Sequence, residues 1–229
     1  MSDAEPKQRS IRSFVKRESR MTDGQKSALD TYWPEYGINA DDNTLNLTQC
    51  FQRYAPTTLE IGTGMGETTI DSARKNPAQN YLAVEVHLPG VGSLIRQAVQ
   101  HQVINIRAIS EDVNHVLDKQ LASGSVQAVS VLFPDPWPKK RHHKRRLIQP
   151  AFIDKIIRVL RADGLLFLAT DWQDYAEHML EICDAHEGLI NLSGTGHYAP
   201  RPYWRRVTKF EQRGNNLGHG NWDLLYRKA

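Results

Sequence analysis

Residues 133–138 read FPDPWP and place Asp135 between two prolines. Each proline fixes its own φ, so the backbone around the carboxylate has little conformational freedom. A carboxylate held in this way beside Trp137 is suited to orienting a planar group. A run of basic residues from Lys139 to Arg146 follows at once and suits a polyanion. Together they predict a site that acts on a nucleic-acid base; the alternative is a proline-rich loop whose Trp137 fills the core.

A second candidate motif, residues 60–66, reads EIGTGMG. Gly62, Gly64 and Gly66 miss the G-x-G-x-x-G spacing of a dinucleotide site by one position, which disfavours an NAD enzyme. The Lys-Ser or Lys-Thr pair of a phosphate-binding loop is also missing. An acidic residue, Glu60, two positions before the first glycine suits a ligand that carries an ammonium. The motif therefore predicts a site for S-adenosyl-L-methionine, although Glu60 could instead form a salt bridge to a basic cluster.

Two further carboxylates extend this cofactor site. Glu85 lies at the end of the next predicted strand, where a carboxylate can accept hydrogen bonds from both ribose hydroxyls. Asp112 follows the strand after that and could receive the adenine amino group, with the adjacent Glu111 as a competing candidate. Asp112 could equally serve as a helix N-cap, because aspartate favours that position.

The chemistry of guanine narrows the role of Asp135. N7 of guanine carries an in-plane lone pair and little proton affinity near neutrality, so its methylation needs no general base. It needs alignment of the nucleophile, the methyl carbon and the departing sulfur. A carboxylate can accept hydrogen bonds from guanine N1–H and the 2-amino group together. We therefore interpret Asp135 as an orienting group that also contacts the cofactor.

The elements that must position these residues alternate along the chain. The patterning predicts an α/β fold with a mostly parallel, doubly wound sheet and helices on both faces. Strands are expected at residues 57–61, 81–86, 103–109, 126–133, 165–169 and 222–227, the last at or near a sheet edge. Helices are expected at residues 68–75, 93–100, 112–121, 152–160 and 172–185. Residues 1–30 show little apolar periodicity and predict a flexible basic arm before a single domain at residues 31–229.

Composition excludes several classes of protein. No apolar run approaches the length of a membrane span, and the polar N-terminus lacks a signal-peptide apolar segment. Cys50 and Cys183 are isolated, which fits a reducing cytoplasm rather than secretion. The histidines show no metal-ligand spacing, so no metal is expected. Net charge is only +3, yet basic residues gather in three clusters, near the N-terminus, at residues 139–146 and at residues 201–213. This unevenness favours a polyanionic partner.

The chain resembles the bacterial tRNA (guanine-N7-)-methyltransferases. The resemblance rests on LEIGTGMG at residues 59–66, EVH at 85–87, FPDPW at 133–137 and ATDW at 169–172. It also rests on RP at 201–202 and VTKFE at 207–211, and it extends from RSFV at residue 12 to GHGNWDL at residue 224. It implies a Rossmann-like class I methyltransferase fold. It also implies methyl transfer to guanine 46 in the tRNA variable loop, with S-adenosyl-L-homocysteine as product.

The resemblance also implies roles for single residues. Asp135 matches the family's proposed catalytic residue, and four acids match its cofactor contacts: Glu60, Glu85, Asp112 and Asp135. The positions that match its substrate contacts are Lys139, Asp171, Thr208, Lys209, Phe210 and Glu211. The RNA-contacting segment maps to the basic run, with the cationic contacts at Arg141, Lys144, Arg145 and Arg146. Asp171 could also cap the following helix.

Two positions depart from the family pattern, and other functions remain open. Thr63 stands where an aromatic residue is common, and Pro138 stands where a polar residue is common. The alternatives are a methyltransferase of another RNA base or a small molecule, and a non-catalytic RNA-binding protein on the same fold. The sequence is compatible with a monomer or a homodimer.

Overall fold

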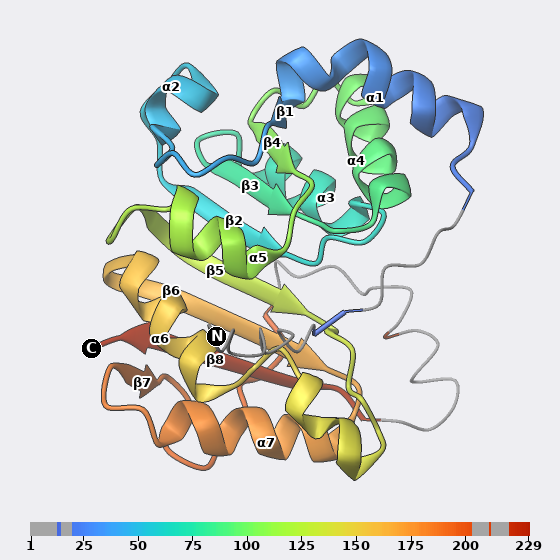
Figure 1. Ribbon diagram of the computed structural model, residues 1–229. Coiled ribbons are helices and arrows are strands. Elements are labelled where there is room, and N and C mark those ends of the chain that lie inside the picture. Colours follow the sequence, from blue (N-terminus) through green and yellow to red (C-terminus); the bar gives the residue numbers. More distant parts are fainter. Residues whose placement is uncertain (1–12, 15–19, 203–210, 212–219) are drawn as a thin grey trace, which may run out of the picture.

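The computed structural model (Figure 1) describes residues 13, 14, 20–202, 211 and 220–229. Its helices and strands follow one another in this order: α1 Asp23–Tyr36, β1 Gly37–Ile38, α2 Leu47–Phe51, β2 Thr57–Ile61, α3 Glu67–Lys75, β3 Asn80–Val84, α4 Leu88–Gln100, β4 Ile106–Ile109, α5 Val113–His115, the π-helical turn η1 Val116–Gln120, β5 Val126–Leu132, the 3₁₀ helix η2 Lys140–Arg145, α6 Pro150–Val159, β6 Leu160–Thr170, α7 Gln173–Asp184, β7 Leu189–Asn191 and β8 Trp222–Lys228.

One eight-stranded sheet joins the two halves of the chain in the order β1-β4-β3-β2-β5-β6-β8-β7. Strands β1 to β6 pair in parallel, while β8 runs antiparallel to both of its neighbours. The order reverses between β2 and β5, because β3 and β4 lie on one side of β2 and β5 and β6 on the other. Open parallel sheets bind ligands at such a switch point, outside the carboxyl ends of the strands.

The sheet is covered by helices on both faces, as the sequence predicts. Side chains alternate along β3, so Tyr81 and Ala83 pack with α3 and α4, whereas Leu82 and Val84 join the larger cluster. That larger cluster also holds the apolar faces of α6 and α7, including Ile153. The larger core therefore packs against β2, β3 and β5, and the smaller one covers the other face of β3 and β4, so the loops after these strands have a fixed base.

Most predicted elements are confirmed, and the differences have local causes. α4 begins at Leu88, earlier than residue 93, because Pro89 fits the first turn of a helix, where it loses no hydrogen bond. α1 runs through residue 30, where the arm was expected to end. It is stabilised by a capping box between Thr22 and Gln25 and buries Ala28 and Tyr36. Residues 1–12 and 15–19 of the expected arm lie outside the described residues.

The last predicted strand, β8, lies near a sheet edge as expected, and the short β7 pairs with its outer side. The expected helix at residues 112–121 divides into α5 and η1. In the part of the chain that the structure describes, no helix is long and apolar enough to cross a membrane.

Candidate functional site

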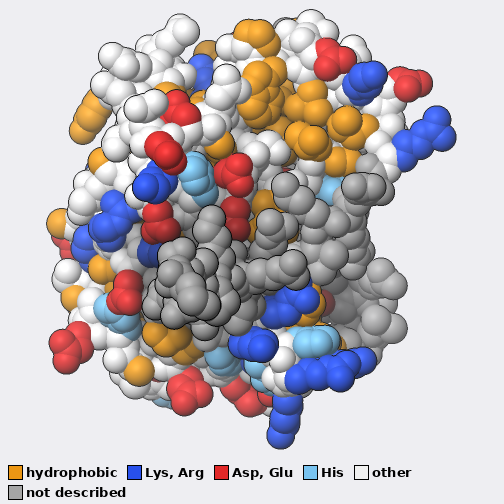
Figure 2. Space-filling view, in the orientation of Figure 1, with side chains coloured by type: hydrophobic (Ala, Val, Ile, Leu, Met, Phe, Trp, Pro, Cys, Tyr) orange, Lys and Arg blue, Asp and Glu red, His pale blue; other side chains and the backbone are white. Residues whose placement is uncertain are grey.

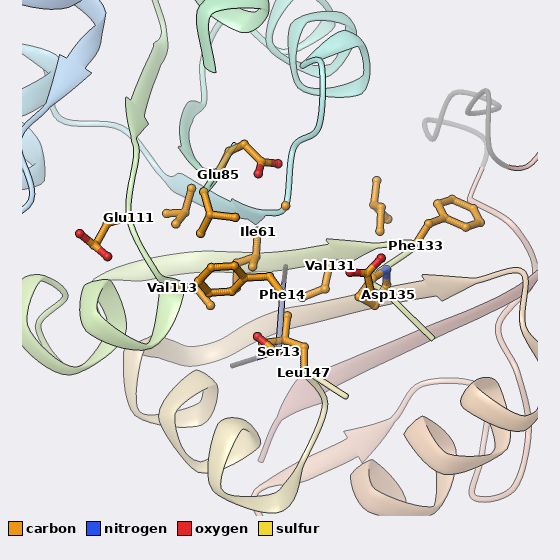
Figure 3. A pocket seen from close by; sticks show the side chains of 15 residues that line it. Ser13, Phe14, Ile61, Glu85, Glu111, Val113, Val131, Phe133, Asp135 and Leu147 are labelled. Carbon is orange, nitrogen blue, oxygen red and sulfur yellow. The ribbon is translucent and has the colours of Figure 1, made fainter. Parts of the chain in front are cut away.

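A cavity of about 250 Å³ opens at the carboxyl ends of β2, β3 and β5. Its lining comes from residues far apart in the sequence: Ser13, Phe14, Ile61, Gly62, Val84, Glu85, Val86, Glu111, Val113, Val131, Leu132, Phe133, Pro134, Asp135 and Leu147. In Figure 3, Glu111 lies at one end of this cavity and Asp135 at the other. The predicted cofactor strand ends and the predicted catalytic loop thus meet at one place, which we call the switch-point cavity.

The glycine-rich turn meets the switch-point cavity at Gly62, while Gly64 and Gly66 are not part of its lining. Gly62, Gly64 and Gly66 have φ values of +73°, +56° and +85°, a backbone conformation that side chains other than glycine rarely adopt. A Cβ at Gly66 would also lie 2.6 Å from Leu94 Cδ1, and one at Gly90 would lie 2.3 Å from the Gly64 carbonyl oxygen. The turn and the first residues of α4 therefore touch backbone to backbone.

Glu85 ties the glycine-rich turn to α4. Its Oε2 accepts a hydrogen bond from Gly64 N at 2.8 Å, and its Oε1 accepts one from His87 N at 2.9 Å. Glu85 as a whole is 9% exposed and lines the switch-point cavity. Each carboxylate oxygen can accept a second hydrogen bond. Glu85 can therefore bind a pair of hydroxyls while its backbone partners keep it in place.

Glu111, rather than Asp112, lines the cavity beyond β4. The Asp112 carboxylate faces its own helix and caps α5, with Oδ1 accepting from Asn114 N at 2.9 Å. Glu111 Oε1 accepts from Asp112 N at 2.7 Å. The capping role weighed for Asp112 is therefore observed, and of the two candidates Glu111 is the one that lines this cavity.

Glu60 lies away from the switch-point cavity. Its neighbour Ile61 lines that cavity, and because side chains alternate along β2, the Glu60 carboxylate points to the opposite face. There it lines a second cavity of about 280 Å³ with Thr58, Ser72 and Ser130, which we call the back cavity. Burial raises the pKa of Glu60 to about 7. A direct contact from Glu60 to a ligand in the switch-point cavity does not follow from this placement.

The loop after β5 holds Asp135 at the rim. Asp135 is exposed and lines the switch-point cavity, as predicted. Phe133 and Trp137 on either side have φ values of +50° and +47°, which cost energy for residues with a Cβ. Such strain persists only where surrounding contacts hold it, and Phe133 N donates to the Ala169 carbonyl at 2.8 Å. The loop is thus a strained conformation held in place at a candidate site.

Trp137 contacts the N-terminal segment rather than presenting an open indole. Its Nε1 donates to the Ser13 carbonyl at 3.1 Å, and the Arg145 guanidinium lies 3.9 Å from the centre of its ring. This contact brings Phe14 into the lining of the cavity (Figure 3). Ser13 and Phe14 were missed as site residues, although the RSFV motif at residue 12 was a signal that could have found them.

The basic run folds as η2 and divides into outward and inward members. Lys and Arg side chains gather over this part of the surface in Figure 2. Lys139, Arg141 and Lys144 are exposed, while Arg145 is half-buried beside Trp137. Arg146, predicted as an RNA contact, is buried in this conformation, with 3% of its surface exposed. Its position follows from its partners, which are the Pro136 carbonyl and the Asp174 carboxylate.

The predicted substrate residues are only partly brought together. Asp171 follows β6 and lines a third, open cavity of about 520 Å³ with Trp172, Gln173, Asp174, Glu177, Gly220 and Trp222. It does not cap α7, whose N-cap is Trp172. Glu211 is 2% exposed and lies 3.6 Å from Arg201 in an ion pair. Thr208, Lys209 and Phe210 lie outside the described residues.

The switch-point cavity fits S-adenosyl-L-methionine by the types of its lining residues. Glu85 presents acceptors for ribose hydroxyls, Glu111 presents an acceptor for an adenine amino group, and Ile61, Val84, Val113 and Val131 supply apolar walls for a ring. Among the residues that the structure describes, no group of three or more His, Cys, Asp or Glu side chains could hold a metal ion.

Comparisons with known proteins point the same way. A family described as "Putative methyltransferase" matches residues 54–224. A curated tRNA (guanine-N(7)-)-methyltransferase from Aeromonas hydrophila is 49% identical over 96% of this chain and 93% of its own length. A protein of the same name from Cronobacter sakazakii is 50% identical over 96% and 92%. The solved structure of the 16S rRNA methyltransferase KamB is similar in fold, with a TM-score of 0.57 and 14% identity over 82% of this chain and 95% of that one.

Proposed function

Because the chain belongs to the tRNA (guanine-N(7)-)-methyltransferase family, we propose that it transfers a methyl group from S-adenosyl-L-methionine to N7 of a guanine in tRNA. The products are 7-methylguanosine and S-adenosyl-L-homocysteine. Guanine 46 of the variable loop is the position that family membership implies. The observation that carries the proposal is that Glu85, after β3, and Asp135, after β5, line one cavity beside the glycine-rich turn.

The cofactor would lie with its adenosine along the ends of β3 and β4. When bound, S-adenosyl-L-methionine supplies an electrophilic methyl carbon on a sulfonium. Glu85 accepts hydrogen bonds from the ribose hydroxyls, and Glu111 accepts one from the adenine amino group. The apolar side chains of Val113 and Val131 exclude water from the ring. Asp135 lies at the opposite end of the cavity from Glu111 (Figure 3), where the reacting group would enter.

The transfer itself needs alignment more than proton chemistry. The lone pair of guanine N7 forms the new bond to the methyl carbon while the electron pair of the carbon–sulfur bond leaves with sulfur. No proton is released from N7, so no residue has to act as a base. Asp135 accepts hydrogen bonds from guanine N1–H and the 2-amino group and directs N7 toward the methyl group. Such positioning supplies a large part of many enzymatic rate enhancements.

The tRNA would bind across the rim outside β5 and β6. Lys139, Arg141 and Lys144 are exposed and suited to phosphate contacts, which are made mainly by Arg and Lys. Asp171 ends β6 in the third cavity and is suited to a guanosine contact. We keep Thr208, Lys209, Phe210 and Glu211 as proposed substrate contacts. The proposed substrate favours a cytoplasmic location.

The test is nucleoside analysis of tRNA after reaction. Unmodified tRNA transcript is incubated with the protein and S-adenosyl-L-methionine, digested, and analysed by mass spectrometry. The expected product is 7-methylguanosine, and a transcript with adenine at position 46 should yield none. A methylated exocyclic amine would instead indicate another base methyltransferase. Absence of S-adenosyl-L-homocysteine would indicate an RNA-binding protein without this activity.

A further inference from the structure

The last residue of the basic run lies on the inner side of the Asp135 loop. Arg146 Nε donates to the Pro136 carbonyl at 3.0 Å, one residue beyond Asp135. Its Nη2 donates to the Asp174 carboxylate in α7, and Nη2 lies 3.1 Å from His143 Nε2. A single guanidinium therefore joins the candidate catalytic loop, η2 and α7.

The surroundings of Arg146 fix the geometry of this junction. Its side chain is 2% exposed, whereas that of Asp174 is 58% exposed. The guanidinium lies over the Tyr175 ring, 4.9 Å from its centre, and Tyr175 in turn accepts a hydrogen bond from Ile148 N at 3.1 Å. The hydrogen bond from Arg146 holds the pKa of Asp174 below its ordinary value. Moving the Arg146 guanidinium away would leave the Pro136 carbonyl and the Asp174 carboxylate without this donor. These contacts therefore favour the observed position of the guanidinium.

The Asp135 loop depends on outside contacts of this kind. Phe133 and Trp137 both hold positive φ angles, so an isolated loop of this sequence would favour other conformations. Arg145 lies over the Trp137 ring, and Arg146 donates a hydrogen bond to the Pro136 carbonyl. The loop is thus gripped at the two residues that follow Asp135.

We propose that Arg146 is a positioning residue for methyl transfer: by holding the Pro136 carbonyl it fixes the Asp135 carboxylate against the guanine. This inference rests on the proposed function and deepens it. The basic turn then has two roles. Its exposed residues hold the tRNA, and its buried arginine sets the geometry of the group that orients the base.

The two roles separate in kinetics. Lysine keeps the charge of Arg146 but lacks the planar fork of donors, so it cannot hold Pro136 and Asp174 together. For Arg146→Lys we expect kcat to fall roughly 10- to 100-fold, as for a catalytic group misplaced by about 1 Å. The KM for tRNA should stay within about twofold, because no phosphate contact is lost. Arg161→Gln, which removes an exposed arginine at the start of β6, should leave both constants unchanged.

The experiment measures kcat, KM for tRNA and thermal unfolding for the full chain and each variant, with 7-methylguanosine as the product. A folded Arg146→Lys variant with unchanged kcat would overturn the proposal. So would a rise in KM alone, which would assign Arg146 to the tRNA. If that variant unfolds, Asp174→Ala decides, because it frees Arg146 from an exposed partner: a fall in kcat with an unchanged KM for tRNA supports the positioning role, and an unchanged kcat or a rise in KM alone overturns it. A wild-type chain that makes no 7-methylguanosine would instead remove the proposed function itself.

Discussion

The switch-point cavity and the back cavity lie on opposite faces of the same strands, and each is lined by one glutamate in a different environment. Glu85 accepts hydrogen bonds from two backbone N–H groups and lines the switch-point cavity. Glu60 lies in the back cavity, where burial raises its pKa to about 7. Both follow from the same β2–β3 pairing. Whether an acidic residue near the glycine-rich turn can reach the switch-point cavity thus depends on the face of the sheet on which its side chain lies.

The largest contrast between the cavities is expected at β5 and the loop after it. Asp135→Ala should lower kcat roughly 10²- to 10³-fold, because the guanine loses its orienting acceptor. Ser130→Ala, on the same strand but in the back cavity, should leave kcat unchanged. Steady-state formation of 7-methylguanosine measures both. Equal losses in the two variants would show that the cavities do not differ in function, and binding of tRNA to Asp135→Ala should persist.

The next largest effect concerns stability against pH. The pKa of Glu60 is raised from 4.5 to about 7, so between these values the folded state keeps a proton that the unfolded state has released. Stability contributed by this site therefore falls as pH rises through that window, by about 3 kcal/mol in total. Glu60→Gln has no such proton to lose and should gain stability over wild type as the pH rises.

Urea unfolding at about pH 5 and about pH 8 measures this gap. The advantage of Glu60→Gln should be larger at the higher pH. Glu181→Gln, on the exposed side of α7, should show no pH-dependent difference from wild type. A constant gap for Glu60→Gln would mean that the carboxyl titrates normally.

The smallest expected effect compares Glu85 and Glu60 by their contribution to cofactor affinity. Glu85→Gln replaces one acceptor oxygen by an NH2 group that confronts a backbone N–H, so the dissociation constant for S-adenosyl-L-homocysteine should rise about tenfold, near 1.4 kcal/mol. Glu60→Gln should change it less than about twofold, because its side chain faces the back cavity. Isothermal titration calorimetry measures both constants. A larger effect at Glu60 would reverse the assignment of the two glutamates.

Strand patterning predicts the site better than it predicts which side chain points into it. The ends of β2, β3 and β5 and the placement of Glu85 and Asp135 at the switch-point cavity follow from apolar runs that stop at chemistry-bearing residues. The choice between Glu111 and Asp112 does not, because β4 ends at Ile109 and the loop that follows has no periodicity. The structure separates the two, because Asp112 caps α5 through Asn114 N while Glu111 lines the cavity.

The sequence also could not predict which residues of the basic run are buried and which are exposed. The pattern KKRHHKRR at residues 139–146 shows charge without direction. The 3₁₀ helix η2 places Arg146 on the inner side of the Asp135 loop. There its guanidinium donates to the Pro136 carbonyl and to the Asp174 carboxylate in α7. Such partners come from residues distant in sequence, so composition and spacing cannot anticipate them. α1 was not predicted for a different reason: its sequence is mostly polar and contains Pro34, so it lacks a clear apolar helical pattern.

The in-register pairing of β2 with β3 and β5 has a consequence for the kinds of sequence change that the chain can tolerate. Glu60 and Ile61 face opposite sides of the sheet, and a shift of one residue exchanges the sides of a whole strand. Deleting one residue from β2 would turn a carboxylate toward the switch-point cavity and an isoleucine toward the back cavity. A point substitution in β2 therefore changes one side chain on one face. An insertion or deletion of odd length moves the side chains of a whole stretch of the strand to the opposite face of the sheet.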